Sequence, residues 1–193
     1  MEKLGRADLF SLESYAEKRK TFRSEVLEHK KPRAVRIGEN ATLYFEDRLT
    51  MQYQVQEMLR IEKIFEAADI QEELDAYNPL IPDGSNWKAT FMMEYGDVDV
   101  RKAELAKLVG IEDKTWVSVD GFDKVYAIAN EDLERSTDEK TSAVHFMRFE
   151  LTPEMAAAAK SGASISAGID HENYLQQVVL SDDSRNSLAK DLS

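Results

Sequence analysis

The stretch EDRLTMQYQVQEMLRIEKIFEAA, residues 46–68, decides the fold prediction because it reads as one long helix that is apolar around most of its circumference. At about 100° per residue, the hydrophilic side of such a helix is narrow. A helix of this kind must be covered by other elements, and polar groups under the cover need partners. We therefore predict a long central helix over residues 46–68 on which a sheet packs.

Polar side chains interrupt this helix along one seam, in steps of three and four residues, which let neighbours meet. The seam consists of Glu46, Thr50, Tyr53, Glu57 and Arg60. A carboxylate beside an arginine stays ionised, so Glu57 with Arg60 could orient a substrate, bind a cation or act as a base. The alternatives are an internal salt bridge that ties the helix to the sheet and a contact within a homo-oligomer. Tyr53, Glu57 and Arg60 are the first candidates for ligand binding.

The first 36 residues differ in charge from the rest of the chain. They hold ten Lys or Arg against six Asp or Glu, whereas the whole chain has a formal net charge of -12. Apolar residues at helical spacing predict a helix from Arg6 to His29, which Pro32 ends. This basic segment is either a solvated helix face or a docking arm for an acidic protein or a phosphate-bearing ligand.

Beyond residue 75 the pattern changes to short strands, hairpins and short helices. Strands are predicted at residues 87–95, 115–119, 124–129, 141–151, 163–169 and 174–180, and Asp120-Gly121 marks a hairpin. We predict a single domain, residues 1–193, of the α+β class, with a mostly antiparallel sheet packed on the central helix. Its parts are a basic helical N-terminal arm (1–36), an α+β core (41–181) and a polar C-terminal helix (182–193).

Three further residues are candidates for binding. The segment Tyr77–Asn86 contains two prolines and a glycine and predicts a stiff loop that presents Asn78 and Trp87 to a ligand, or a rigid corner that closes the sheet. His145 lies on the apolar face of a predicted strand, either as a ligand or as a hydrogen-bonded core residue. The second functional model below assembles Tyr53, Glu57, Arg60, Trp87 and His145 into one pocket.

The absence of cysteine excludes disulfides, thiolate zinc sites, iron–sulfur clusters bound by this chain and cysteine nucleophiles. No metal site is predicted, because the histidines are scattered and Arg60 stands where a Glu-x-x-His pair would need its histidine. Phosphate-binding glycine motifs are missing, and no cofactor can be named. The negative charge disfavours nucleic acid, and no apolar run suits a membrane or a signal sequence, so we expect a cytoplasmic protein.

Five segments carry a resemblance to a known family: FEDRLT (45–50), QYQVQEMLR (52–60), ELDAYNPLIPDG (73–84), WKAT (87–90) and VHFMRFELT (144–152). The chain resembles a bacterial family catalogued as domain of unknown function 3501, over nearly its whole length. The resemblance implies a gene neighbourhood with a rubrerythrin-like protein and a cysteine-rich iron–sulfur oxidoreductase, and hence an accessory role in a redox or oxidative-stress system.

Two functional models follow from these observations. In the first, the protein is a non-catalytic accessory protein that docks on a rubrerythrin-like or iron–sulfur partner through the basic helix or the stiff loop. In the second, it is a small enzyme or ligand-binding domain with a pocket around Glu57 and Arg60. A pocket that encloses this pair would favour the second model.

Overall fold

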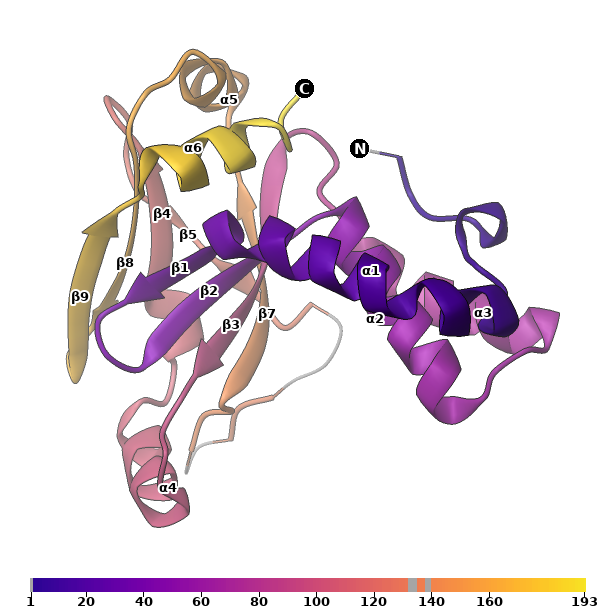
Figure 1. Ribbon diagram of the computed structural model, residues 1–193. Helices are drawn as coiled ribbons and strands as arrows, with labels where there is room; N and C mark the ends of the chain where they lie inside the picture. Colours follow the sequence, from indigo (N-terminus) through magenta and orange to yellow (C-terminus); the bar gives the residue numbers. More distant parts are fainter. Residues whose placement is uncertain (1, 132–134, 138–139) are drawn as a thin grey trace.

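Two antiparallel sheets packed face to face form the body of the molecule (Figure 1). The computed structural model describes residues 2–131, 135–137 and 140–193. The first sheet has the strand order β1-β2-β3-β7-β6 and the second has the order β5-β4-β8-β9. The strands are β1 (Ala34–Ile37), β2 (Ala41–Glu46), β3 (Asn86–Met93), β4 (Thr115–Val119), β5 (Val125–Tyr126), β6 (Ile128–Ala129), β7 (Val144–Glu150), β8 (Ile165–His171) and β9 (Tyr174–Val179).

The helices fall into two groups. Three of them, α1 (Leu12–Lys30), α2 (Arg48–Glu62) and α3 (Ala67–Tyr77), project from the sandwich as an arm (Figure 1). Helices α5 (Pro153–Lys160) and α6 (Asp182–Ala189) lie over one end of the sandwich, and α4 (Val98–Lys107) lies at the other end. Short 3₁₀ turns span Arg6–Asp8, Lys31–Arg33, Asn78–Leu80 and Ile111–Lys114. The predicted α+β class is confirmed.

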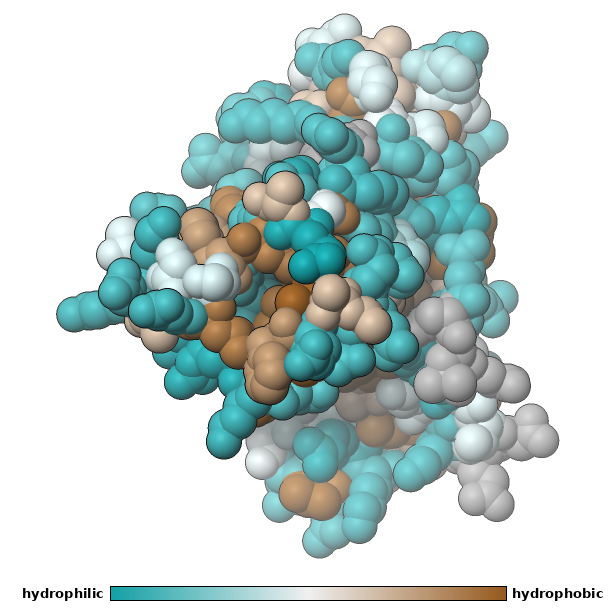
Figure 2. Space-filling model, turned by 90° about the vertical axis from the view of Figure 1, so that its right-hand side faces the viewer, coloured by the Kyte–Doolittle hydropathy of each residue, from teal (hydrophilic) through white to brown (hydrophobic). Residues whose placement is uncertain are grey.

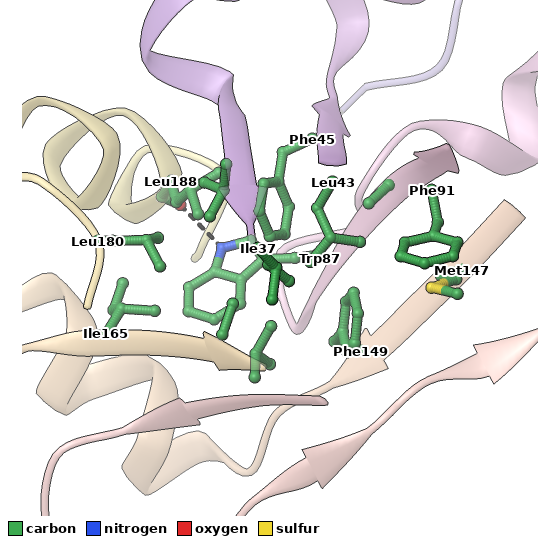
Figure 3. Close-up of a cluster of buried hydrophobic side chains, with 14 of the residues drawn as sticks. Ile37, Leu43, Phe45, Trp87, Phe91, Met147, Phe149, Ile165, Leu180 and Leu188 are labelled. Carbon is green, nitrogen blue, oxygen red and sulfur yellow. Dashed lines mark hydrogen bonds between the residues drawn. The ribbon is translucent and has the colours of Figure 1, made fainter. Parts of the chain in front are cut away.

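The main core lies between the two sheets, where strand alternation sends every second side chain inward. In β3, Trp87, Ala89, Phe91 and Met93 are buried, while the residues between them are partly exposed. These side chains meet Phe45 and Leu43 of β2, Phe149 and Met147 of β7, and Ile165 of β8 (Figure 3). The first sheet is therefore covered by the second sheet.

The predicted central helix is wrong in length and in position. Residues 46–68 divide into the end of β2, helix α2 and the start of α3. Asp47 begins α2, because its Oδ1 accepts from the Thr50 amide at 3.0 Å while its own amide donates to the Thr50 hydroxyl at 2.9 Å. Lys63 ends α2 in the left-handed region, with φ 56°. This turn sends α3 back along α2, so that Ile64 packs against an apolar cluster within the arm rather than beneath a sheet.

The arm has a small apolar cluster of its own, in which α2 and α3 pack with the segment that precedes α1. Its buried members are Leu4, Met51, Val55, Leu59, Leu74 and Ile81. Figure 2 looks at the arm end-on and shows apolar side chains gathered in the middle of this face, surrounded by hydrophilic residues. Near the turn between α2 and α3, Ile61 and Phe65 are 63% and 72% exposed. Every helix in the described part of the chain is too short or too polar to cross a lipid bilayer.

The outer face of the second sheet contains one close approach that only glycine allows. Gly168 of β8 lies opposite Trp116 of β4, and a Cβ at Gly168 would meet the indole ring at 2.3 Å. The ring lies flat on this glycine, beneath the ammonium of Lys124, which is 4.2 Å from the ring centroid. Both tryptophans, Trp87 and Trp116, therefore belong to the sandwich.

Candidate functional site

An open trough runs between the arm and the outer face of the first sheet. Its larger lobe has a volume of about 580 Å³ and its smaller lobe about 410 Å³, and both are lined by Tyr77, Leu80 and Phe146. Strands β2, β3 and β7 form the floor, and the arm forms the wall. The other lining residues are Leu27, Lys30, Lys31, Ala34, Tyr44, Glu46, Met51, Gln54, Thr90, Met92 and Val144 in the larger lobe and Ala76, Pro79, Lys88, Glu131, Met147 and Arg148 in the smaller.

The floor consists of the residues that alternate with the core positions. Because Trp87, Ala89 and Phe91 point inward, Lys88 and Thr90 point outward. Strand pairing arranges these outward residues in rows across the sheet, one of them Tyr44–Thr90–Phe146 and the next Glu46–Lys88–Arg148. The first row is mainly apolar or aromatic, and the second carries charge. The floor thus changes from an apolar to a charged surface along the strands.

Glu46 is a carboxylate in the floor of the larger lobe. Its residue is only 6% exposed, and its Oε1 accepts a hydrogen bond from the Thr90 hydroxyl at 2.8 Å. Its cross-strand neighbour is Lys88, yet no ion pair forms between the two in the structure. Glu46 is therefore held by a neutral donor, and its charge is not cancelled by the neighbouring ammonium.

Lys88 is the unusual cation of the trough. Its neighbour Arg148 is neutralised by two carboxylates, with Nη2 2.8 Å from Glu131 Oε1 and Nη1 2.5 Å from Glu150 Oε2. Within the described residues, the Lys88 ammonium has no hydrogen bond or ion pair. Burial, followed by the charge of Arg148, lowers the pKa of Lys88. The more distant charges of Glu131 and Asp83 oppose this shift, and a bound anion would add the direct contact that Lys88 lacks.

The predicted pair of Glu57 with Arg60 is replaced by a different one. Arg19 of α1 holds Glu57 with both arms of its guanidinium, Nε to Oε1 at 2.7 Å and Nη2 to Oε2 at 2.8 Å, and Tyr15 donates to Oε1 at 2.6 Å. Arg60 is exposed and acts on Glu57 only as a weaker, more distant charge. The Arg19 hydrogen bonds come first among the effects that lower the pKa of Glu57 to about 2. Glu57 therefore ties α1 to α2.

Tyr53 belongs to the same contact between α1 and α2. Its ring lies 6.1 Å from that of Phe22, which in turn makes an edge contact with Tyr15 at 6.2 Å. These aromatic rings lie beside the ion pair of Glu57 with Arg19, because Tyr15 also donates a hydrogen bond to Glu57. The polar seam of α2 is thus covered by α1, and the sheet predicted to cover it lies elsewhere.

Trp87 and Asn78 are placed at the two ends of the predicted stiff loop, and neither faces open space. Trp87 is fully buried, and its Nε1 donates to the carbonyl of Leu188 in α6 at 3.0 Å (Figure 3). The side-chain amide of Asn78 donates from Nδ2 to the Leu4 carbonyl at 2.9 Å, and its Oδ1 accepts from the Leu4 amide at 2.8 Å. Asn78 therefore fastens the N-terminal segment to the arm, while Trp87 fastens α6 to the sandwich.

His145 is fully buried on the inner face of β7, away from the trough. Its Nε2 lies 2.9 Å from the Thr141 hydroxyl and its Nδ1 about 3 Å from the Asn130 side chain. Burial lowers the pKa of His145, against the opposing charge of Glu112, whose Oε2 is 3.8 Å from Nε2. The ring is therefore a neutral part of an internal hydrogen-bond network.

These positions correct the predicted common pocket. Tyr53, Glu57 and Arg60 lie on α2 in the arm, whereas Trp87 and His145 lie in the core of the sandwich. Within the described part of the chain, no group of three or more His, Asp or Glu side chains is arranged to hold a metal ion.

A larger cavity, about 760 Å³, lies where the arm meets α6, and its buried charges pair with one another. Buried Arg33 lies 2.6 Å from Asp191 Oδ2 and 3.5 Å from Asp47 Oδ2, and it donates to the Phe45 carbonyl at 2.9 Å. His29 in turn lies 2.5 Å from Asp47. Burial raises the pKa of Asp191 to about 6, although Arg33 opposes this shift. We interpret this cluster as a clamp between the arm, β2 and α6.

Sequence reasoning missed most of the trough. The strand predicted at residues 87–95 contains Lys88, Thr90 and Met92, but its pairing with the strands of Tyr44 and Phe146 was not predicted. The available signal was the presence of large apolar or aromatic residues at outward positions of three strands, since such positions on a solvated sheet face are normally polar.

Comparison with known proteins gives the chain a family but no activity. A crystal structure of a novel protein of unknown function from Burkholderia pseudomallei K96243 matches with a TM-score of 0.95 and 53% sequence identity, over 100% of both chains. No curated protein matches the chain. The family model described as protein of unknown function (DUF3501) matches residues 3–192. The chain therefore belongs to the DUF3501 family.

Proposed function

We propose that this protein is a binding protein whose trough takes an elongated amphipathic anion, that is, an apolar body with a carboxylate or phosphate head. The observation that carries the proposal is Lys88, a half-buried ammonium that makes no hydrogen bond or ion pair within the described residues. A cation that has lost part of its hydration gains most from a ligand that restores its charge balance.

The rest of the trough suits the apolar body of such a ligand. Tyr77, Leu80 and Phe146 line the junction of the two lobes, and Met92 and Val144 extend the apolar floor. Each lobe falls within the range of about 300–1,000 Å³ that small-molecule sites occupy. Apolar contact supplies affinity here, and the charged row at the end of the floor supplies orientation.

Residues of the basic N-terminal segment border the same trough. Lys30 and Lys31 line the larger lobe, and Lys3 is close enough to Lys88 to contribute to the lowering of its pKa. The lining also carries the carboxylates of Glu46 and Glu131, and Lys31 is paired with Glu28 at 2.6 Å, so the charges of the trough are mixed. Lys88, which makes no ion pair within the described residues, is the position that favours a phosphate or carboxylate head over a cationic one.

A dye-binding experiment tests this proposal. The probe is 1-anilinonaphthalene-8-sulfonate, an apolar anion, with dodecanoate and dodecylammonium as competitors. We expect dodecanoate to displace the dye and dodecylammonium to fail, and Lys88→Met to weaken dodecanoate binding about tenfold, since one charge-assisted contact contributes about 1.4 kcal/mol or more. Lys102→Met, on the exposed surface of α4, is the matched control and should bind as the wild type does.

The outcome that contradicts the proposal is equal displacement by both competitors, or unchanged dodecanoate affinity in Lys88→Met. The first result would indicate an unspecific apolar surface, and the second would place the head group elsewhere.

The second candidate function is an accessory role in which α1 docks on an acidic redox partner, of the rubrerythrin-like or iron–sulfur kind that the family resemblance implies. The observation in its favour is that α1 lies on the projecting arm with its basic residues Lys18, Lys20 and Arg23 on its surface. Titration of a rubrerythrin-like protein against the wild type and Arg23→Glu tests it. We expect binding that weakens with salt and is lost in the variant; absence of wild-type binding at low salt would refute it.

A further inference from the structure

Strand β9 is an edge strand that lacks the usual protection of such strands. It is the last strand of the second sheet and pairs with β8 on one side only, at the left margin of Figure 1. Its sequence, YLQQVV (174–179), carries no charge and no proline, although 32% of the chain is charged. Leu175 and Val179 are 72% and 66% exposed. Exposed edges of this kind are templates for pairing with another strand.

The free backbone groups of β9 can be assigned from its ladder with β8. The amide of Leu180 donates to the Ile165 carbonyl of β8 at 2.9 Å. In an antiparallel ladder the backbone groups of alternate residues point to the same side. Gln176 and Val178 therefore direct their amides and carbonyls toward β8, whereas Leu175, Gln177 and Val179 direct theirs away from the sheet. In the described structure no strand lies on that side.

We infer that β9 pairs antiparallel with β9 of a second copy of this chain. The two copies are related by a two-fold axis that passes between their Gln177 residues. Gln177 then faces Gln177 of the partner subunit, and Leu175 faces Val179 of the partner subunit. All three residues that lack backbone partners exchange hydrogen bonds in this register, and the two second sheets join into one continuous sheet.

The side chains of β9 favour a second copy over another partner because this register is self-complementary. Residues directly opposite in a ladder share a face, and Leu175 and Val179 both lie on the outer face of the sheet. The symmetric pairing therefore creates an apolar pair on either side of the central glutamines. Registers shifted by one residue would place an outward side chain opposite an inward one.

Charge determines how the contact responds to salt. Asp170, next to the strand, is already paired with Lys124 at 2.7 Å. In the inferred register, Glu172 comes close to Asp182 of the partner subunit at each end of the pairing, and each copy carries a formal net charge of -12. Like charges at these ends oppose association, so moderate salt should strengthen the dimer.

The first test measures the mass of the protein in solution by analytical ultracentrifugation at increasing concentration. We expect a dimer that is strengthened by salt and whose dissociation constant rises at least tenfold in Gln177→Pro. Proline at this position removes an outward amide, so the fold tolerates it. Phe65→Lys at the arm tip, where the residue is 72% exposed, is the control for loss of exposed apolar surface. A wild type that stays monomeric, or a dimer unaffected by Gln177→Pro, would overturn the inference.

The second test identifies the register by disulfide cross-linking. The chain has no cysteine of its own, so only the introduced residues can cross-link. Facing residues of the hydrogen-bonded kind have Cα atoms about 5.5 Å apart, within reach of a disulfide. Gln177→Cys should therefore cross-link on oxidation. Leu175→Cys should not, because the two copies of residue 175 are about 14 Å apart in this register. The double variant with Leu175→Cys and Val179→Cys should cross-link again. Equal cross-linking of the two single variants would overturn the register.

Discussion

The sandwich and the arm are stabilised by different kinds of contact. The core of the sandwich extends from β1 to α6 and consists of interdigitated apolar side chains from both sheets. The arm has a much smaller apolar cluster, and polar contacts between distant residues fasten its parts: Glu57 with Arg19, Asn78 with Leu4, and Gln56 with the backbone of Phe10 at 2.6 Å. The comparison indicates that a small projecting element needs directed contacts where a larger body can rely on burial.

The trough lies at the boundary of these two regions. Its floor belongs to the sandwich and most of its wall belongs to the arm, so its shape depends on both. Variants that act on one region alone can therefore separate the contributions of the floor and of the wall.

The largest expected effect is in the sandwich. Trp87→Ala removes the largest fully buried side chain and its hydrogen bond to Leu188, and should lower the free energy of unfolding by about 4 kcal/mol. Urea denaturation measures the loss, with Phe65→Ala at the exposed arm tip as the control that should change little. A loss below about 1 kcal/mol would mean that the sandwich core is not the main source of stability.

The next effect is in the arm. Leu59→Ala removes a buried side chain from the small cluster, and we expect a loss of about 2–3 kcal/mol, at the low end for such substitutions, because few neighbours surround the site. Amide hydrogen exchange should show faster exchange in α1, α2 and α3 with β3 and β7 nearly unchanged. Uniform acceleration across both regions would instead indicate that arm and sandwich open as one unit.

The smallest effect of the three is that of Glu57→Gln, which removes the ion pair with Arg19. We expect a loss of about 2 kcal/mol at neutral pH, the typical range for hydrogen bonds to charged groups. Because the folded-state pKa of Glu57 is lowered to about 2, its stabilisation is present above the ordinary pKa and is lost as the pH falls from 4.5 toward 2. The difference between wild type and variant should shrink over this interval.

Dodecanoate binding to Glu57→Gln separates structure from function in the arm. If Glu57 only ties α1 to α2, the variant should be less stable and bind dodecanoate as the wild type does. Unaltered stability together with lost binding would return Glu57 to the candidate binding residues.

Much of the fold could be predicted because most elements have local signals. The strand predicted at residues 87–95 is present as β3, and the hairpin predicted at Asp120-Gly121 is the turn between β4 and β5. The division of residues 46–68 was missed although Asp47 and Thr50 are suited to a helix start. The start was missed because apolar residues lie on both sides of Asp47. The end was missed because α2 stops at a lysine in the left-handed region, Lys63, whereas the usual sequence signal for such a helix end is a glycine.

The candidate site could not be predicted in the same way because it depends on which elements meet. Glu57 and Arg60 are neighbours on one helix surface, but the partner that Glu57 takes, Arg19, lies 38 residues earlier in the chain. Tyr44, Lys88 and Phe146 come together only through the order of β2, β3 and β7 in the sheet. Strand order is a tertiary property, and neither spacing nor composition encodes it locally.

The location of the two tryptophans makes the two regions separately visible to spectroscopy. Trp87 and Trp116 both report on the sandwich, and Trp87 lies in its core, whereas the arm contains three of the longest helices and no tryptophan among its described residues. Intrinsic fluorescence therefore follows the sandwich, while far-ultraviolet circular dichroism is weighted toward the arm. Coincident melting curves from the two signals would mean cooperative unfolding, and a circular-dichroism transition at lower temperature would mean that the arm melts first.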